Sequence, residues 1–116
     1  KRRITMSNKE HLSALEERLK AIDFEESLCN AFLKIENREE MILFLKDLLT
    51  PKELSSMIER WKVCQLLERG DLSYREIHAL TSASLTTIGR VARFINEEKN
   101  DGYRLVLGRM KKEEKI

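Results

Sequence analysis

The sequence predicts an all-α protein, because three of its properties indicate helices and none indicates a sheet. Charged side chains make up 36% of the 116 residues, whereas there are only four glycines and one proline. Apolar residues recur at helical spacing along most of the chain. At two expected helix starts, Thr50 and Ser73, a glutamate follows three residues later, which is the pattern of a capping box.

Three helices are expected in the first half of the chain, over residues 10–24, over residues 25–35 and from Asn37 onward. Residues 1–8 are interpreted as a flexible basic tail. The first helix is indicated by apolar residues at helical spacing: Leu12, Leu15, Leu19 and Ile22.

The third helix contains five consecutive apolar residues, Met41–Leu45. Such a run covers the whole circumference of a helix, so that a single packing face cannot bury it. In a chain this short, a partner subunit is the simplest way to cover the rest, and the run therefore favours an obligate dimer. A buried strand is the alternative, but the sequence contains no second strand to pair with it.

A fourth helix is expected to begin at Thr50, where three signals coincide. Thr50 suits the N-cap, Pro51 the first helical position and Glu53 the third. The helix should end at Gly70, because glycine readily adopts the left-handed conformation of a C-cap. Six of its residues are expected to face inward: Leu54, Met57, Ile58, Trp61, Cys64 and Leu67.

Residues 73–94 match a helix-turn-helix, a motif whose second helix can lie in a DNA major groove. Ser73 and Glu76 form a capping box, after which Ile77 and Leu80 give one apolar edge. The second helix is expected to begin at Ser84. Ser82 occupies the turn position where glycine is common, at a cost of about 1 kcal/mol if φ is positive. An ordinary helical hairpin is the alternative interpretation. Four apolar residues should hold the two helices together: Ile77, Ala83, Ile88 and Val91.

Charge is distributed unevenly along the chain. Residues 10–59 carry twelve acidic and six basic side chains, whereas residues 60–93 carry six basic and three acidic ones. The basic excess coincides with the predicted helix-turn-helix, where a phosphate backbone would lie, although such a run can also be a solvated face.

The remaining composition predicts a cytoplasmic protein with no cofactor. Cys29 and Cys64 lack the spacing of metal ligands and are expected to be buried or half-buried thiols. No apolar stretch approaches the length of a membrane span, and Lys1-Arg2-Arg3 precedes polar residues rather than a signal peptide core.

If the motif binds DNA, the expected exposure of each side chain indicates which part of the DNA it contacts. Arg75 could form a bidentate contact with guanine or, alternatively, pair with a carboxylate. Small or apolar side chains on the second helix suit thymine methyl groups, shape and bridging water: Leu85, Thr86 and Gly89. The Ser84 and Thr87 hydroxyls suit phosphate contacts, or cap the helix, or both. His78 either reaches a phosphate or is simply solvated.

At these residues the chain resembles the Trp repressor superfamily, and in particular its YerC/YecD branch. The matching segments are AFLKIENREE at 31–40, FLKDLLTPKELSSMIERWKV at 44–63, ASLTTIGRV at 83–91, and Gly102-Tyr103. The resemblance implies an intertwined helical homodimer with a helix-turn-helix head in each subunit. Residues 9–110 would form this domain, and residues 111–116 a charged tail.

The resemblance also implies an effector pocket. The tryptophan-sensing members hold the amino acid with two arginines, which this chain keeps at Arg60 and Arg90. Val91 and Phe94 stand where those members have glycine and serine, and both add bulk. We therefore expect that free tryptophan is not the co-repressor; any other small-molecule effector is unknown. Alternatively, the arginines brace the helices or contact phosphate.

The sequence therefore predicts a homodimeric, sequence-specific DNA-binding regulator, a repressor, whose partner is a double-stranded operator. The alternative is a helical protein–protein adaptor that has kept the fold but not DNA binding. An enzyme is disfavoured, because no catalytic triad, metal-ligand cluster or phosphate-cradling loop is present.

Overall fold

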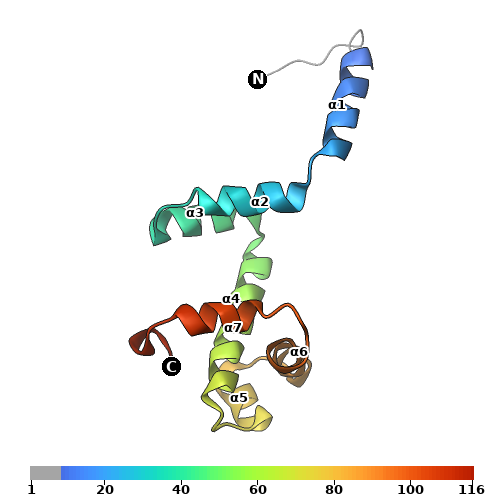
Figure 1. Cartoon of the computed structure of the whole chain (residues 1–116). Coiled ribbons are helices and arrows are strands. Elements are labelled where there is room, and N and C mark those ends of the chain that lie inside the picture. Colours follow the sequence, from blue (N-terminus) through green and yellow to red (C-terminus); the bar gives the residue numbers. More distant parts are fainter. Residues whose placement is uncertain (1–8) are drawn as a thin grey trace. The chain divides into compact units, whose positions relative to one another are not determined.

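The computed structural model describes residues 9–116, so the predicted tail at residues 1–8 lies outside the described part of the chain. Within residues 9–116 the chain is all-helical, as the sequence predicts, with no strand (Figure 1). The α-helices are α1 (Lys9–Ala21), α2 (Phe24–Leu33), α3 (Arg38–Leu48), α4 (Pro51–Arg69), α5 (Tyr74–Thr81), α6 (Leu85–Asn96) and α7 (Gly102–Arg109). A 3₁₀-helix, η2 (Lys112–Glu114), follows them.

The chain divides into two compact units, and the first ends at Leu45. Two of its helices, α2 and α3, begin at side-chain caps: Asp23 accepts a hydrogen bond from the Glu26 amide, and Asn37 accepts one from the Glu40 amide, at 3.1 and 2.9 Å. Because Met41–Leu45 is helical, the strand interpretation of that run is wrong. The first two predicted helices have shifted bounds, since Phe24 begins α2 rather than ending α1.

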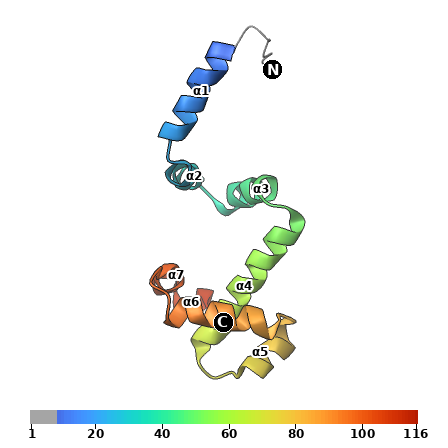
Figure 2. The same ribbon diagram turned by 90° about the vertical axis from the view of Figure 1, so that its right-hand side faces the viewer.

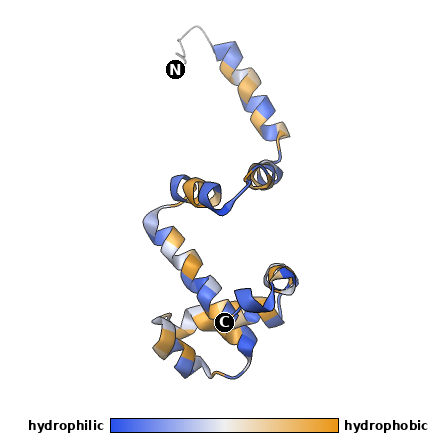
Figure 3. Ribbon diagram, turned by 90° about the vertical axis from the view of Figure 1, so that its left-hand side faces the viewer, coloured by the Kyte–Doolittle hydropathy of each residue, from blue (hydrophilic) through white to orange (hydrophobic). Residues whose placement is uncertain are grey.

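Apolar side chains in this unit remain largely uncovered. No residue of α1, α2 or α3 is buried, although Phe32 and Phe44 meet edge to face with ring centroids 5.2 Å apart. Leu33 is 81% exposed and Leu43 is 66% exposed. Figure 3 shows the apolar positions on these helices in orange, interleaved with hydrophilic ones. Cys29, expected to be at least half-buried, is exposed.

The second unit spans Lys46–Ile116 and is built on α4. Both halves of the predicted capping box are present: the Thr50 hydroxyl accepts from the Glu53 amide at 3.1 Å, and the Glu53 carboxylate accepts from the Thr50 amide at 2.8 Å. Gly70 ends the helix in the left-handed conformation with φ of 80°, as expected.

The core of this unit lies where α5 and α6 pack on the C-terminal half of α4 (Figures 1 and 2). The prediction that Met57 and Ile58 face inward is wrong for this chain, since they are 41% and 53% exposed. Leu80 is also not part of the apolar edge of α5, being 65% exposed; Thr81 is buried instead. The buried apolar residues are Val63, Cys64, Leu66, Ile77, Ala83, Ile88, Val91, Ala92, Ile95 and Leu107.

Candidate nucleic-acid interface

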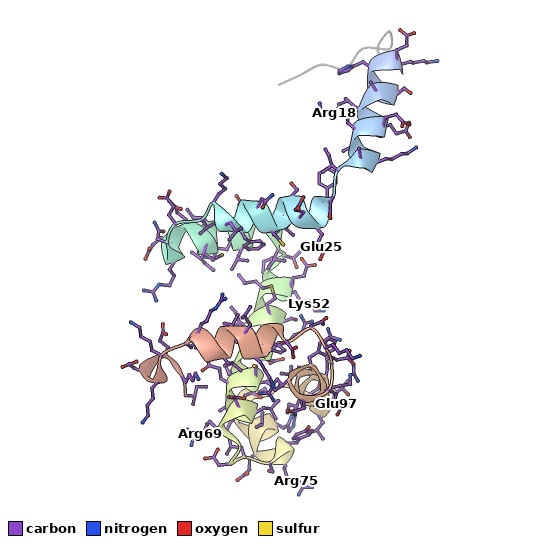
Figure 4. All side chains as sticks on the ribbon, in the orientation of Figure 1. Arg18, Glu25, Lys52, Arg69, Arg75 and Glu97 are labelled. Atoms are coloured by element: carbon purple, nitrogen blue, oxygen red, sulfur yellow. The ribbon has the colours of Figure 1, made fainter. Side chains whose placement is uncertain are left out.

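The capping box at the start of α5 fixes the direction of the first helix of the motif. The Ser73 hydroxyl accepts from the Glu76 amide at 3.1 Å, and the Glu76 carboxylate accepts from the Ser73 amide at 2.8 Å. Arg75, in the same turn, is exposed and projects away from the body of the unit (Figure 4). No carboxylate in residues 9–116 pairs with it, so its guanidinium is available to a ligand.

The turn between α5 and α6 has the backbone conformation that the sequence predicts. Ser82 has φ of 66°, so a serine stands in the left-handed region that favours glycine. The two helices meet through Ile77, Ala83 and Ile88, each with 0% exposure. The predicted helix-turn-helix packing is therefore present.

Thr81, to which the sequence analysis gave no role, holds this turn together. Its buried hydroxyl donates to the Ile77 carbonyl at 2.7 Å and accepts from the Ala83 amide at 3.0 Å. A buried amide without a partner is costly, so this hydroxyl makes the serine turn tolerable. The signal that could have revealed it is the chemistry of a threonine placed one residue before a turn.

His78 makes a contact that neither of its two predicted roles includes. Its Nδ1 donates to the Ala83 carbonyl at 2.6 Å, which requires the proton to sit on Nδ1. The ring therefore braces the turn. Its Nε2 is not engaged by this bond and stays a candidate for a phosphate contact.

The start of α6 combines a capped helix end with exposed small side chains. The Ser84 hydroxyl accepts from the Thr87 amide at 3.0 Å and donates to the Thr87 hydroxyl at 3.1 Å, so Ser84 is the N-cap and Thr87 is its partner. Leu85 and Thr86 are exposed, Leu85 by 57%. Amides at a helix N-terminus also attract phosphate.

Gly89 lies one turn further along α6 and is half-buried. A Cβ built at this position would meet no atom within 4 Å. Since glycine costs about 0.5–1 kcal/mol relative to alanine in a helix, packing within this chain gives no reason for it. The face of α6 next to Leu85 and Thr86 therefore has open space at Gly89, which would allow another molecule to approach the helix closely.

The basic side chains of residues 60–93 are all exposed, but some of them pair with a carboxylate. Arg69 binds Asp71 through two hydrogen bonds of 3.1 and 2.8 Å, and its position is marked in Figure 4. Arg93 lies 3.7 Å from Glu98. The positive charge available to an anion therefore concentrates on the remaining members of the group: Arg60, Lys62, Arg75 and Arg90.

The residues of the predicted effector pocket divide into two sets. On α6, the Arg90 guanidinium lies over the Phe94 ring at 4.4 Å, and Val91 is buried with 1% exposure. On α4, Arg60 is exposed and borders a groove of about 530 Å³. That groove is lined by Leu49, Thr50, Lys52, Glu53, Ser56, Met57 and Arg60, and by no residue of α6.

The pKa of Tyr103 in α7 is affected by an arginine of each set. Burial raises the pKa of its phenol, with the nearby Cys64 adding to the rise, while the Arg60 and Arg90 cations act against it. Burial also raises the pKa of the Cys64 thiol to about 11, which keeps it neutral.

Comparison with known proteins decides the family. The family model of the Trp repressor protein matches residues 25–111, about three-quarters of the chain. The chain belongs to the Trp repressor family. Within residues 9–116, this family member has no helix long and apolar enough to cross a membrane, and no cluster of three or more His, Cys, Asp or Glu side chains that could hold a metal ion.

Relatives of this Trp repressor family member agree with the assignment. The protein YerC of Bacillus subtilis strain 168, itself uncharacterised, is 37% identical over 89 residues, covering 77% of this chain and 84% of YerC. A candidate Trp repressor from Staphylococcus aureus superposes with a TM-score of 0.69 at 35% identity, covering 78% of this chain and 90% of that one. A TrpR-like protein from Eubacterium eligens superposes with a TM-score of 0.65 at 37% identity, covering 75% of this chain and 91% of that one.

Proposed function

We propose that this Trp repressor family member is a sequence-specific DNA-binding regulator that acts as a homodimer in the cytoplasm, as a repressor. The observation that carries the proposal is the first turn and a half of α6. There Leu85 and Thr86 are exposed beside Gly89, whose open Cβ position serves no packing within the chain. These small and apolar groups suit contact with base edges and thymine methyl groups.

The surroundings of α6 suit this role. Arg75 supplies a free guanidinium for guanine, while the Ser84 and Thr87 hydroxyls and the His78 Nε2 are groups suited to phosphate contacts. The turn that sets α6 against α5 is fixed by two hydrogen bonds of the Thr81 hydroxyl. A rigid turn supports specificity, because base contacts require side chains to be placed precisely.

The homodimer is inferred from the uncovered apolar surface of the first three helices. No side chain of α1–α3 is buried, and leucines such as Leu33 and Leu43 are mostly exposed. Large exposed apolar surfaces on one chain indicate an interface. A dimer would present two heads to half-sites about one helical turn, roughly 34 Å, apart.

The effector pocket implied by the family resemblance is proposed to be closed to free tryptophan. Arg90 already has an aromatic ring beneath it, that of Phe94, and Val91 is packed into the core. Any effector that switches this protein would therefore differ from tryptophan in its mode of binding.

The test begins with selection of bound duplexes from a random pool, followed by titration of the selected duplex. Gly89→Ala is the decisive variant. We expect it to stabilise the fold by about 0.5–1 kcal/mol, because alanine favours helix, and yet to weaken binding of the selected duplex. Gly108→Ala in α7 is the matched control, since its Cβ position is equally open and it should gain stability without losing affinity.

Two charge variants separate sequence recognition from general attraction to DNA. Arg75→Ala should cost about 1–3 kcal/mol for the selected duplex and relax its sequence preference, whereas Lys62→Ala should weaken all duplexes similarly and reduce the salt dependence. Equal tight binding of all duplexes would contradict sequence specificity. Absence of binding to any duplex at low salt would favour the adaptor function instead.

A further inference from the structure

The last helix, α7, takes no part in the proposed DNA contact, yet one of its side chains reaches the far end of α6. Arg104 donates from Nε to the Ile95 carbonyl at 2.9 Å and from Nη2 to the Asn96 side-chain oxygen at 3.0 Å. Its Nη1 lies 3.9 Å from the Glu68 carboxylate of α4. The guanidinium of one α7 residue thus contacts both α4 and α6.

The end of α6 is a place where such a contact matters. The last carbonyls of a helix have no partner within the helix, and cations near them are favourable. Here the cap residue Glu97 is not in the left-handed conformation, and the amides of Glu97 and Glu98 both bond to the Arg93 carbonyl, at 2.8 and 3.0 Å. The Arg104 guanidinium, not a backbone amide, therefore provides the partner of the Ile95 carbonyl.

We propose that Arg104 is a positioning residue, which fixes the C-terminal end of α6 and thereby sets the direction in which its N-terminal end points. The inference rests on the proposed function in taking α6 as the helix that contacts DNA. The buried Ile88, Val91, Ala92 and Ile95 pack one face of α6 against the core. The polar contacts of Arg104 at Ile95–Asn96 add a directional constraint at the C-terminal end, which opposes tilting of the helix on that core.

A small rotation would be enough to disturb base contacts. Twelve residues of helix extend about 18 Å, so a tilt of about 5° about the centre moves the first residue by just under 1 Å. Hydrogen bonds weaken steeply over such displacements. Leu85 and Thr86 lie at that end, so Arg104 affects them although it touches neither.

The chemistry of the side chain gives the test. Arginine presents its donors in a rigid planar fork, whereas lysine is a compact point charge. Arg104→Lys keeps the charge that faces Glu68 but cannot reproduce the paired contacts to Ile95 and Asn96. Arg109→Gln, also in α7 and exposed, is the matched control, because it removes one positive charge outside these contacts.

Two readouts are measured on the full chain. The first is amide hydrogen exchange in the absence of DNA: in Arg104→Lys we expect the amides of α6 to exchange about tenfold faster than in the unaltered protein, while Arg109→Gln leaves them unchanged. The second is the ratio of affinities for the selected duplex and for random duplexes. This ratio should fall about tenfold in Arg104→Lys and stay constant in Arg109→Gln.

The outcomes distinguish the two proposals. If Arg104→Lys changes neither the exchange rate of the α6 amides nor the affinity ratio, the positioning role is overturned. The positive charge alone would then be enough to hold α6. Faster exchange in α6 with no DNA binding by the unaltered protein would support the positioning of α6 and contradict the proposed function instead. Arg104→Gln, which removes the charge as well as the paired contacts, is a second variant. If it fails to fold, Arg104→Lys still decides the matter, since it retains the charge.

Discussion

The guanidinium of Arg90 lies over the ring of Phe94, with 4.4 Å between the guanidinium carbon and the ring centroid. The four-residue spacing along α6 places the two side chains on the same face of the helix. A cation over an aromatic face is attracted by the ring quadrupole, by about 0.5–1 kcal/mol at an exposed site. The ring thus occupies one of the two faces of the Arg90 guanidinium, and an aromatic ligand cannot replace it there unless the ring moves.

We therefore expect no micromolar binding of free tryptophan to the unaltered protein in titration calorimetry. The double variant Val91→Gly/Phe94→Ser removes the two bulky side chains and frees the Arg90 guanidinium, so it should bind tryptophan more tightly than the unaltered protein does. Phe94→Leu serves as control, because it loses the cation–π contact but keeps an apolar group in place. Micromolar binding by the unaltered protein would show that the pocket is open.

The turn of the helix-turn-helix should depend on the Thr81 hydroxyl. Thr81→Val keeps the shape of the side chain but leaves the buried Ala83 amide without its partner, at an expected cost of about 1–3 kcal/mol in the free energy of unfolding. Thr81→Ser keeps the hydroxyl and should cost less. Urea denaturation of the three proteins makes the comparison, and equal losses in both variants would assign the effect to packing rather than to the hydrogen bonds.

Local signals in the sequence were sufficient for the helix starts and for the turn. Thr50, Ser73 and Ser84 each cap a helix as predicted, because a cap depends on residues three positions away and not on distant packing. Ser82 takes the positive φ expected of its place in the motif, although glycine would do so more easily. Such features are fixed by chain neighbours, so they can be inferred from the sequence alone.

Contacts between helices could not be inferred in the same way. Leu80 follows helical spacing after Ile77, yet Thr81 rather than Leu80 is buried, because the hydroxyl of Thr81 finds partners in the turn. Nor does any sequence pattern join Arg104 to Ile95, nine residues away across a connector. The candidate site was therefore predicted well at the start of α6 and poorly where α5 and α7 support it.

Stability should depend on acid pH through two carboxylates. Hydrogen bonds with Thr50 hold the pKa of Glu53 below its ordinary 4.5, and a hydrogen bond from Arg69 holds the pKa of Asp71 below 3.8. A lowered folded-state pKa means that the ionised form stabilises the fold above the unfolded-state value. This stabilisation is then lost as the pH falls through the folded-state pKa.

Unfolding by urea at a series of pH values from neutral to acid checks this dependence. The contribution of the two groups should be constant at neutral pH and decline once the pH falls below about 4.5. Glu53→Gln can still accept the hydrogen bond from the Thr50 amide but does not titrate, so its stability should fall less steeply in acid. A profile identical to that of the unaltered protein would rule out Glu53 as a contributor.

The uncovered leucines of α2 and α3 predict how the protein assembles. Burying a leucine stabilises an interface by about 1.5–3 kcal/mol, so Leu33→Asp combined with Leu43→Asp should dissociate the dimer. Sedimentation equilibrium should give twice the 13.7 kDa chain mass for the unaltered protein and a lower mass for the double variant. Lys34→Asp with Lys46→Asp places two aspartates at neighbouring exposed polar positions, with a larger change in net charge, and should still leave the dimer intact. A monomeric unaltered protein at micromolar concentration would contradict the homodimer, since the apolar surface of α1–α3 would then have to be covered by a different partner.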